Sequence, residues 1–228
     1  MKEKSNRPDF SMYLAHFTKD GKFCNDEQRE ELNPILGQDA KQRLFSILRQ
    51  KKIFASKMPW TGLPCVCYTE CPWSSLLAHT AQYSPYGIGF NKEFIFNHNG
   101  APALYVRVNI FNKLRKKKVK SKLTKEENEL WVFTTPFSPI YGSSYTKKLL
   151  KRWVDYSHER EWRTPKDLDF QYDDLAFIIL KSICDYESMP MDIKSQIENA
   201  NVKIIIMDNY RLIEELWPVH KINESHSR

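Results

Sequence analysis

The chain has 228 residues, of which 41% are hydrophobic and 28% are charged, a composition typical of folded proteins and not of disordered chains. This length predicts one domain over residues 1–228, with loose ends at about 1–10 and 221–228. The 35 Lys and Arg residues outnumber the 28 Asp and Glu residues, and the resulting charge of +7 favours an anionic partner.

Several functional classes lack their sequence patterns here. Only seven residues are Gly, and neither G-x-G-x-x-G nor G-x-x-x-x-G-K-[ST] occurs, which argues against dinucleotide-fold and P-loop proteins. The absence of a long apolar run and of an apolar N-terminal core predicts no membrane partner and no secretion. Five Cys, an odd number, fit a reducing cytoplasm better than a disulfide scaffold.

Apolar periodicity predicts an α+β domain. Strands are predicted at residues 12–17, 65–70, 87–90, 103–108, 130–135, 161–163, 175–180 and 202–207. Helices are predicted from Asp39 to about Lys52, after Pro72, after Thr146, at about 193–199 and as a last turn at 210–216. The runs 175–180 and 202–207 are continuously apolar, as central strands are.

One segment, residues 113–122, has the sequence KLRKKKVKSK, in which seven of ten residues are basic. Such a block repels itself, so we expect an exposed loop between two strands. Two interpretations stay open, a solvated surface and an arm that contacts the phosphates of nucleic acid. The contacts of such an arm would be Arg115, Lys116, Lys117, Lys118 and Lys120.

Two early strands carry candidate binding residues. His16 lies in an apolar run and shares a strand face with Thr18, so the pair suits hydrogen bonding to a ribose, although a lone His in such a run is more often a core residue. The second strand contains Tyr68 and Thr69 between cysteines. The spacing C-x-C-x₃-C lacks the usual zinc-knuckle pattern, so no metal is expected.

Two glycines stand close together in this Gly-poor chain. Gly87 and Gly89 in a strand indicate close approach by a ligand, a neighbouring strand or a packed helix.

The segment Glu159-Arg160-Glu161-Trp162-Arg163 is the best candidate catalytic element. In an extended chain Glu159, Glu161 and Arg163 share one face, and two neighbouring carboxylates can take different acid–base roles. An edge strand with solvated charges is the alternative.

Taken in order, these motifs resemble the AbiGi family of abortive-infection phage-resistance proteins over about residues 12–210. The same order is similar to a diverged ADP-ribosyltransferase of the DarT type, a class of toxins that modify nucleic acid. This second resemblance implies a split mixed β-sheet with flanking helices, NAD as co-substrate and no metal. It places His16, with Thr18 beside it, at the ribose of NAD. It makes Glu161 the catalytic residue, with Glu159 as the second carboxylate two positions earlier. It matches Tyr68 and Thr69 to the motif of the second strand, and Tyr86 to an aromatic residue that stacks on nicotinamide.

The expected function is therefore an NAD-dependent ADP-ribosyltransferase toxin of a phage-defence system. Its expected acceptor is nucleic acid, RNA being favoured over DNA because of the basic segment, and its expected protein partner is a cognate antitoxin. The alternative is a non-catalytic antitoxin or regulatory nucleic-acid-binding module of an abortive infection system. A nuclease is a weaker third possibility, since no Asp-x-Glu-x-Lys pattern occurs.

Overall fold

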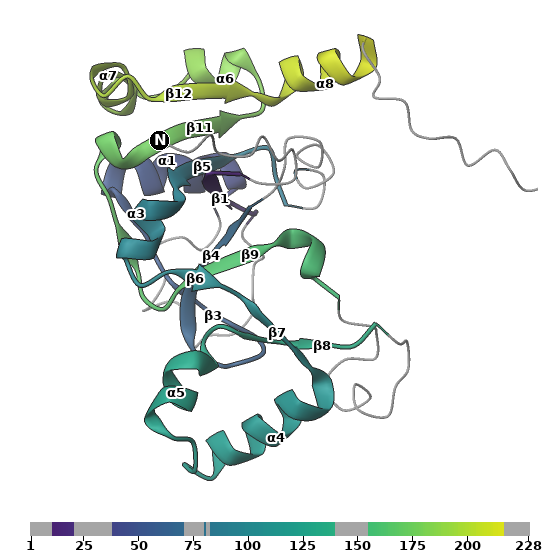
Figure 1. Cartoon of the computed structure of the whole chain (residues 1–228). Coiled ribbons are helices and arrows are strands. Elements are labelled where there is room, and N and C mark those ends of the chain that lie inside the picture. Colours follow the sequence, from purple (N-terminus) through teal and green to yellow (C-terminus); the bar gives the residue numbers. More distant parts are fainter. Residues whose placement is uncertain (1–10, 21–37, 71–79, 81–82, 140–154, 217–228) are drawn as a thin grey trace, which may run out of the picture.

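The computed structural model describes residues 11–20, 38–70, 80, 83–139 and 155–216 (Figure 1). The helices predicted after Pro72 and after Thr146 and the predicted loose ends lie outside the described residues.

The described chain alternates between short strands and helices. Its strands are β1 (Tyr13–Phe17), β2 (Lys52–Ile53), β3 (Ser56–Lys57), β4 (Pro64–Thr69), β5 (Gly87–Asn91), β6 (Ala101–Pro102), β7 (Leu104–Arg107), β8 (Thr134–Phe137), β9 (Glu161–Thr164), β10 (Leu168–Asp169), β11 (Leu175–Leu180) and β12 (Lys203–Ile206). Its helices are α1 (Ala40–Gln50), α3 (Lys92–Asn97), α4 (Val108–Val119), α5 (Lys125–Trp131), α6 (Ile183–Glu187), α7 (Met191–Asn199) and α8 (Met207–Leu216), with short 3₁₀ turns η3 (Ser157–Glu159) and η4 (Tyr172–Asp174).

The central sheet has the strand order β12-β11-β5-β1-β4-β9-β6, and β3 pairs with β4. β11 and β12 run parallel, whereas β1, β4, β5 and β9 pair antiparallel with their neighbours. A mixed sheet with helices confirms the α+β class. A specific likeness to the ADP-ribosyltransferase sheet stays a prediction.

Helices cover the sheet because their apolar stripes need a partner surface. Asp39 caps α1 by accepting from the Gln42 backbone N–H, as predicted, and Leu44 and Leu48 of α1 then point into the main core. That core also contains Phe90 and Ile178 from the sheet. The other sheet face holds a smaller cluster of Ala15, Phe17, Ile179 and Met207.

The two glycines of β5 let neighbouring groups approach its backbone. A Cβ on Gly87 would lie 2.7 Å from the His16 carbonyl oxygen of β1. A Cβ on Gly89 would lie 2.3 Å from the Phe177 ring of β11. Neighbouring strands therefore account for both glycines, which decides between the alternatives that the sequence left open.

The expectation of a basic loop at 113–122 is wrong for most of the segment. Residues 113–119 belong to α4, which forms a hairpin with α5 between the parallel strands β7 and β8. Like-charge repulsion between helix neighbours costs only about 0.2–0.5 kcal/mol per pair, whereas burial of Phe111 against Trp131 contributes more. The two rings stack at 5.1 Å between centroids, and the hairpin stands at the end of the molecule opposite α6, α7 and α8 (Figure 1).

Two predicted strands are placed differently. The strand expected at 130–135 is instead the end of α5 followed by β8, because Thr124 and Glu127 form a capping box that starts a helix. The strand expected at 202–207 is β12, which lies at the sheet edge and not in its centre. It is continuously apolar because Ile204 packs on the main core and Ile205 on the smaller cluster.

Within the described ranges, no helix is long and apolar enough to cross a lipid bilayer.

Candidate functional site

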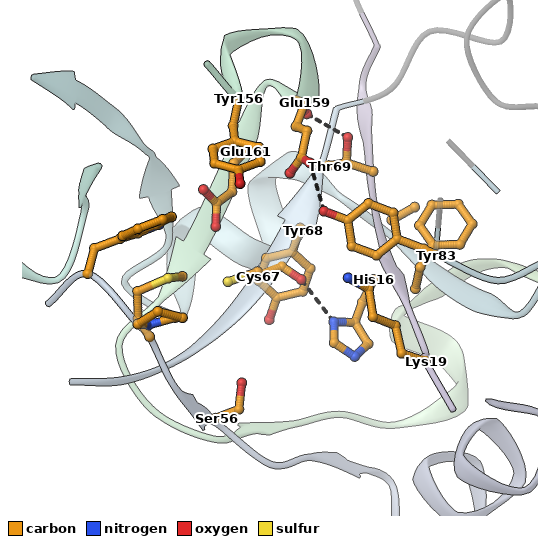
Figure 2. A pocket seen from close by; sticks show the side chains of 15 residues that line it. His16, Lys19, Ser56, Cys67, Tyr68, Thr69, Tyr83, Tyr156, Glu159 and Glu161 are labelled. Atoms are coloured by element: carbon orange, nitrogen blue, oxygen red, sulfur yellow. Dashed lines mark hydrogen bonds between the residues drawn. The ribbon is translucent and has the colours of Figure 1, made fainter. Parts of the chain in front are cut away.

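A pocket of about 410 Å³ lies beside β1, β4 and β9 and collects most of the predicted site residues (Figure 2). Its lining includes His16, Tyr68, Thr69, Glu159 and Glu161, which come from three strands and a turn that are distant in the sequence. The order of these strands in the sheet brings them together. Five of the seven residues predicted as catalytic or cofactor-binding therefore share one cavity.

Two other predicted binding residues lie elsewhere. Thr18 is buried after the end of β1, and its hydroxyl donates to the Ala40 carbonyl at 2.7 Å. The Tyr86 hydroxyl donates to Asp185 at 3.2 Å, and burial followed by the charge of Asp185 raises the pKa of Tyr86 to about 12. Neither side chain lines the pocket. Thr18 and Tyr86 thus serve packing and hydrogen bonding within the protein.

His16 presents an acceptor atom. Its Nδ1 lies 2.8 Å from the Cys67 carbonyl oxygen, which accepts only, so Nδ1 carries a proton. Burial lowers the pKa of His16, which keeps the ring neutral near pH 7. In a neutral ring with a protonated Nδ1, Nε2 is a hydrogen-bond acceptor.

The lowered pKa of His16 predicts a pH-dependent stability. The unfolded chain binds a proton at His16 near the usual pKa of about 6.5, whereas the folded protein does not, so stability is full above that pH and falls as the pH drops below it. We expect the free energy of unfolding to decrease between pH 8 and pH 5.5. In His16→Asn, which keeps a donor near the Cys67 carbonyl but does not titrate, this decrease becomes smaller.

Urea unfolding followed by circular dichroism at several pH values measures this difference. His158→Asn is the matched control, because His158 is exposed on the η3 turn. An identical pH dependence in His16→Asn and the unchanged protein would contradict a lowered pKa of His16 in the folded protein.

Glu159 enters the pocket from the turn before β9. Arg160 has a φ of 45° in the left-handed region, and this bend turns the chain between η3 and β9. The Glu159 carboxylate accepts from the Tyr83 hydroxyl at 2.8 Å, and its backbone carbonyl accepts from the Thr69 hydroxyl at 2.6 Å. Burial raises the pKa of Glu159, and the hydrogen bond from Tyr83 opposes that rise.

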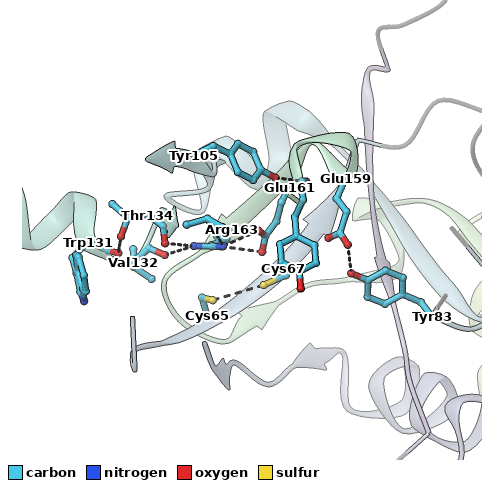
Figure 3. Close-up of polar contacts among 12 residues, drawn as sticks. Cys65, Cys67, Tyr83, Tyr105, Trp131, Val132, Thr134, Glu159, Glu161 and Arg163 are labelled. Atoms are coloured by element: carbon cyan, nitrogen blue, oxygen red, sulfur yellow. Dashed lines mark hydrogen bonds and ion pairs between the residues drawn. The ribbon is translucent and has the colours of Figure 1, made fainter. Parts of the chain in front are cut away.

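Glu161 lines the pocket and pairs with a buried arginine, Arg163, behind it (Figure 3). Arg163 Nε and Nη2 donate to the two Glu161 carboxylate oxygens at 2.9 and 2.7 Å. Burial disfavours the Arg163 charge, but this pairing raises the pKa of Arg163 above its usual value. The guanidinium also donates to the carbonyls of Val132 and Thr134, which tie β9 to the α4–α5 hairpin unit.

The cysteines of β4 lie side by side. Cys65 Sγ and Cys67 Sγ are 3.8 Å apart and both thiols are free of disulfide bonds. Among the described residues, no group of three or more His, Cys, Asp or Glu side chains is arranged to hold a metal ion. Cys71, the third cysteine of the C-x-C-x₃-C spacing, lies outside the described residues.

Aromatic residues that the sequence did not single out complete the pocket. Trp60 and Tyr156 lie with ring centroids 6.2 Å apart, and Lys19 Nζ lies 3.7 Å above the centre of the Tyr83 ring. Trp60 stands in an irregular loop after β3 and Tyr156 in the approach to η3, so no periodicity marked them. Catalytic roles for Glu161 and Glu159, and NAD as the ligand, stay predictions.

The second candidate surface is the outer side of α4. Its lysines at positions 113, 116, 117 and 120 are exposed and three or four residues apart, so they share one side of the helix. Of the other predicted contacts, Arg115 is half-buried and Lys118 donates to Asn128 at 2.5 Å. Lys117 also pairs with Glu127 at 2.9 Å.

A comparison with protein families identifies the family of this chain. The model described as "Putative abortive phage resistance protein AbiGi, antitoxin" matches residues 41–208. The chain belongs to the AbiGi family. No curated protein and no solved structure matches it.

Membership of AbiGi confirms the predicted family and corrects the predicted function. The family is described as an antitoxin, which overturns the expectation of an NAD-dependent ADP-ribosyltransferase toxin and supports the alternative of an abortive-infection antitoxin. The matched residues include α4, Glu159 and Glu161, whereas β1 with His16 precedes them. A cognate partner protein is compatible with this family.

Proposed function

We propose that this chain is the antitoxin of an abortive infection system and that it acts by binding, with the outer side of α4 as its contact for nucleic acid. The observation that carries the second part is the distribution of charge. Residues 108–125 contain eight basic and no acidic residues, whereas the rest of the chain contains 27 basic and 28 acidic residues. The whole α4–α5 hairpin, residues 108–131, contains eight basic and three acidic residues, so its net charge of +5 supplies most of the +7 of the protein.

The geometry of the hairpin suits a phosphate backbone. Lys113, Lys116 and Lys120 are exposed along two turns of α4, and the helix projects at one end of the molecule (Figure 1). Phe111 and Trp131 bury the opposite side of the helix, so it presents its lysines on a supported surface. Lysines that contact phosphates fix the position of a protein on nucleic acid, but they do not distinguish one base sequence from another.

Replacing Lys113, Lys116 and Lys120 together by Gln is expected to weaken binding to a 20-nucleotide single-stranded RNA at least about tenfold at low salt. Each lost phosphate contact lowers the slope of log affinity against log salt by about 0.7, so the slope falls by about 2. Fluorescence anisotropy over a range of KCl concentrations measures both quantities. A 20-base-pair DNA, for which each contact is worth about 0.9, distinguishes the two nucleic acids.

A matched triple variant separates this surface from net charge alone. Lys166, Lys181 and Lys203 are exposed and lie away from α4, and their replacement by Gln removes the same charge. We expect this variant to retain the salt slope of the unchanged protein. Two results would overturn the proposed contact: an equal loss of affinity in the two triple variants, or no salt-dependent binding of either nucleic acid by the unchanged protein. Either result would leave an acidic protein surface as the partner of α4.

A further inference from the structure

The pocket offers hydrogen-bond acceptors, and four of its donor groups are used within the protein. The Tyr83 hydroxyl donates to Glu159 and the Thr69 hydroxyl donates to the Glu159 backbone carbonyl. The Tyr68 hydroxyl shares a hydrogen bond with Thr164, and His16 Nδ1 donates to Cys67. What these groups leave toward the pocket is acceptor capacity.

The two carboxylates enter the cavity from η3 and β9, and His16 enters it from β1 (Figure 2). A carboxylate has about four acceptor positions, and Tyr83 supplies one donor to Glu159. His16 Nε2 is an acceptor for the reason given above. The charge of Glu161 is compensated by Arg163, so Glu159 contributes the main negative charge of the lining.

The remaining walls are aromatic. Trp60 and Tyr156 are half-buried and line the same cavity as Glu159, and Tyr83 already has the Lys19 ammonium over its ring. An aromatic ring beside a carboxylate binds a cation through both the ring quadrupole and the charge. The Lys19–Tyr83 contact is such an arrangement within the chain itself.

A guanidinium matches this lining better than a phosphate does. It is planar, carries five N–H donors and no acceptor, and stacks on aromatic rings. A phosphate has only acceptors, and Lys19 is the one cationic side chain among the described residues that line the pocket. We propose that this pocket binds the guanidinium group of an arginine side chain from a partner protein.

The partner's role as the toxin rests on the proposed function, whereas the preference for guanidinium does not. The pocket and the outer side of α4 use different residues, so the two proposals fail separately. Loss of nucleic-acid binding in the α4 triple variant leaves the pocket intact, and a change in the pocket leaves the α4 lysines in place.

The test uses N-acetyl-L-arginine amide as probe and the full chain as receptor. The indole N–H signal of Trp60 in a nitrogen–proton NMR spectrum, assigned with a Trp60→Phe variant, reports occupation of the pocket. We expect saturable binding with a Kd on the order of millimolar, as fits a ligand of this size. The corresponding citrulline amide, which has nearly the same shape but no charge, is expected to bind at least about tenfold more weakly.

Glu159→Gln keeps the shape of the side chain and removes its charge, so it is expected to weaken arginine amide binding about tenfold. Glu187→Gln, at an exposed position of α6, is the matched control and is expected to bind as the unchanged protein does. The other signals of each spectrum show whether the variant is folded. Trp60→Leu is a second variant of the pocket, and we expect calorimetry to show that it has lost binding of arginine amide.

Three results would overturn the proposal. They are equal binding of the arginine and citrulline amides, absence of a saturable Trp60 shift up to the solubility limit, and displacement of arginine amide from the pocket by NAD or AMP at lower concentration. The last would show that the cavity prefers a nucleotide.

Discussion

Arg163→Met is expected to lower the free energy of unfolding by about 3–5 kcal/mol, because removing one partner of a buried ion pair leaves the other charge uncompensated. The Arg163 side chain is fully buried and pairs with Glu161, whose side chain is 11% exposed. Its loss also removes the donors to the carbonyls of Val132 and Thr134. Urea unfolding followed by circular dichroism measures the loss.

A double-mutant cycle assigns the cause. Glu161→Gln combined with Arg163→Met removes both charges, so the double variant is expected to be more stable than the sum of the single losses implies. Arg211→Met is the control, because Arg211 is exposed on α8. A loss in Arg163→Met no larger than in this control would show that the buried guanidinium contributes little to stability.

Arg163 also connects the two candidate surfaces. Its hydrogen bonds to Val132 and Thr134 join β9, which carries Glu161, to the chain leaving the α4–α5 hairpin. The Trp131 indole N–H donates to the Thr61 carbonyl at 3.1 Å in the loop that holds Trp60. These contacts join the chain around the α4–α5 hairpin to the strand and the loop that line the pocket.

Gly87→Ala is expected to lower the free energy of unfolding by about 1–3 kcal/mol, the cost of forcing an extra carbon into a packed site. The new Cβ would lie 2.7 Å from the His16 carbonyl oxygen, and a backbone atom paired within a sheet has little room to yield. The strand β1 must then shift, which displaces the His16 ring from the pocket. Thermal unfolding measures the stability, and the Trp60 signal in the arginine titration measures the pocket.

Gly89 provides the comparison for this prediction. A Cβ there would meet the Phe177 ring at 2.3 Å and not the backbone, so Phe177→Leu in the same chain is expected to recover part of the stability lost in Gly89→Ala. No second side-chain substitution is expected to rescue Gly87→Ala, because the obstacle is the β1 backbone. Equal stability of Gly87→Ala and the unchanged protein would show that β1 and β5 can separate without cost.

The proposed antitoxin role changes how the pocket is interpreted. His16, Tyr68, Thr69, Glu159 and Glu161 line one cavity, whereas the predicted Thr18 and Tyr86 do not. In the proposed antitoxin this cavity serves recognition, and its acceptors and aromatic walls favour a cationic group of a partner.

Local elements follow from sequence patterns that a few neighbouring residues determine. The apolar runs of β1 and β11 and the Asp39 cap before α1 are each visible within one short segment of the sequence. Strand alternation also predicts that Glu161 and Arg163 share a face, and the two side chains do meet. The concentration of positive charge at 113–122 is likewise a property of the chain alone.

The rest depends on residues distant in the sequence that the strand order brings together. The basic segment is helical because Phe111 meets Trp131, a contact between two helices that charge patterning does not reveal. Thr18 lies outside the pocket because its hydroxyl donates a hydrogen bond to the Ala40 carbonyl at the start of α1. Trp60 and Tyr156 line the pocket although they lie in loops, where the sequence has no periodicity. Sequence periodicity indicates which side of an element is buried. The element that packs against this side is determined by the tertiary structure. These tertiary contacts determine both the helical fold of the basic segment and the residues that line the pocket.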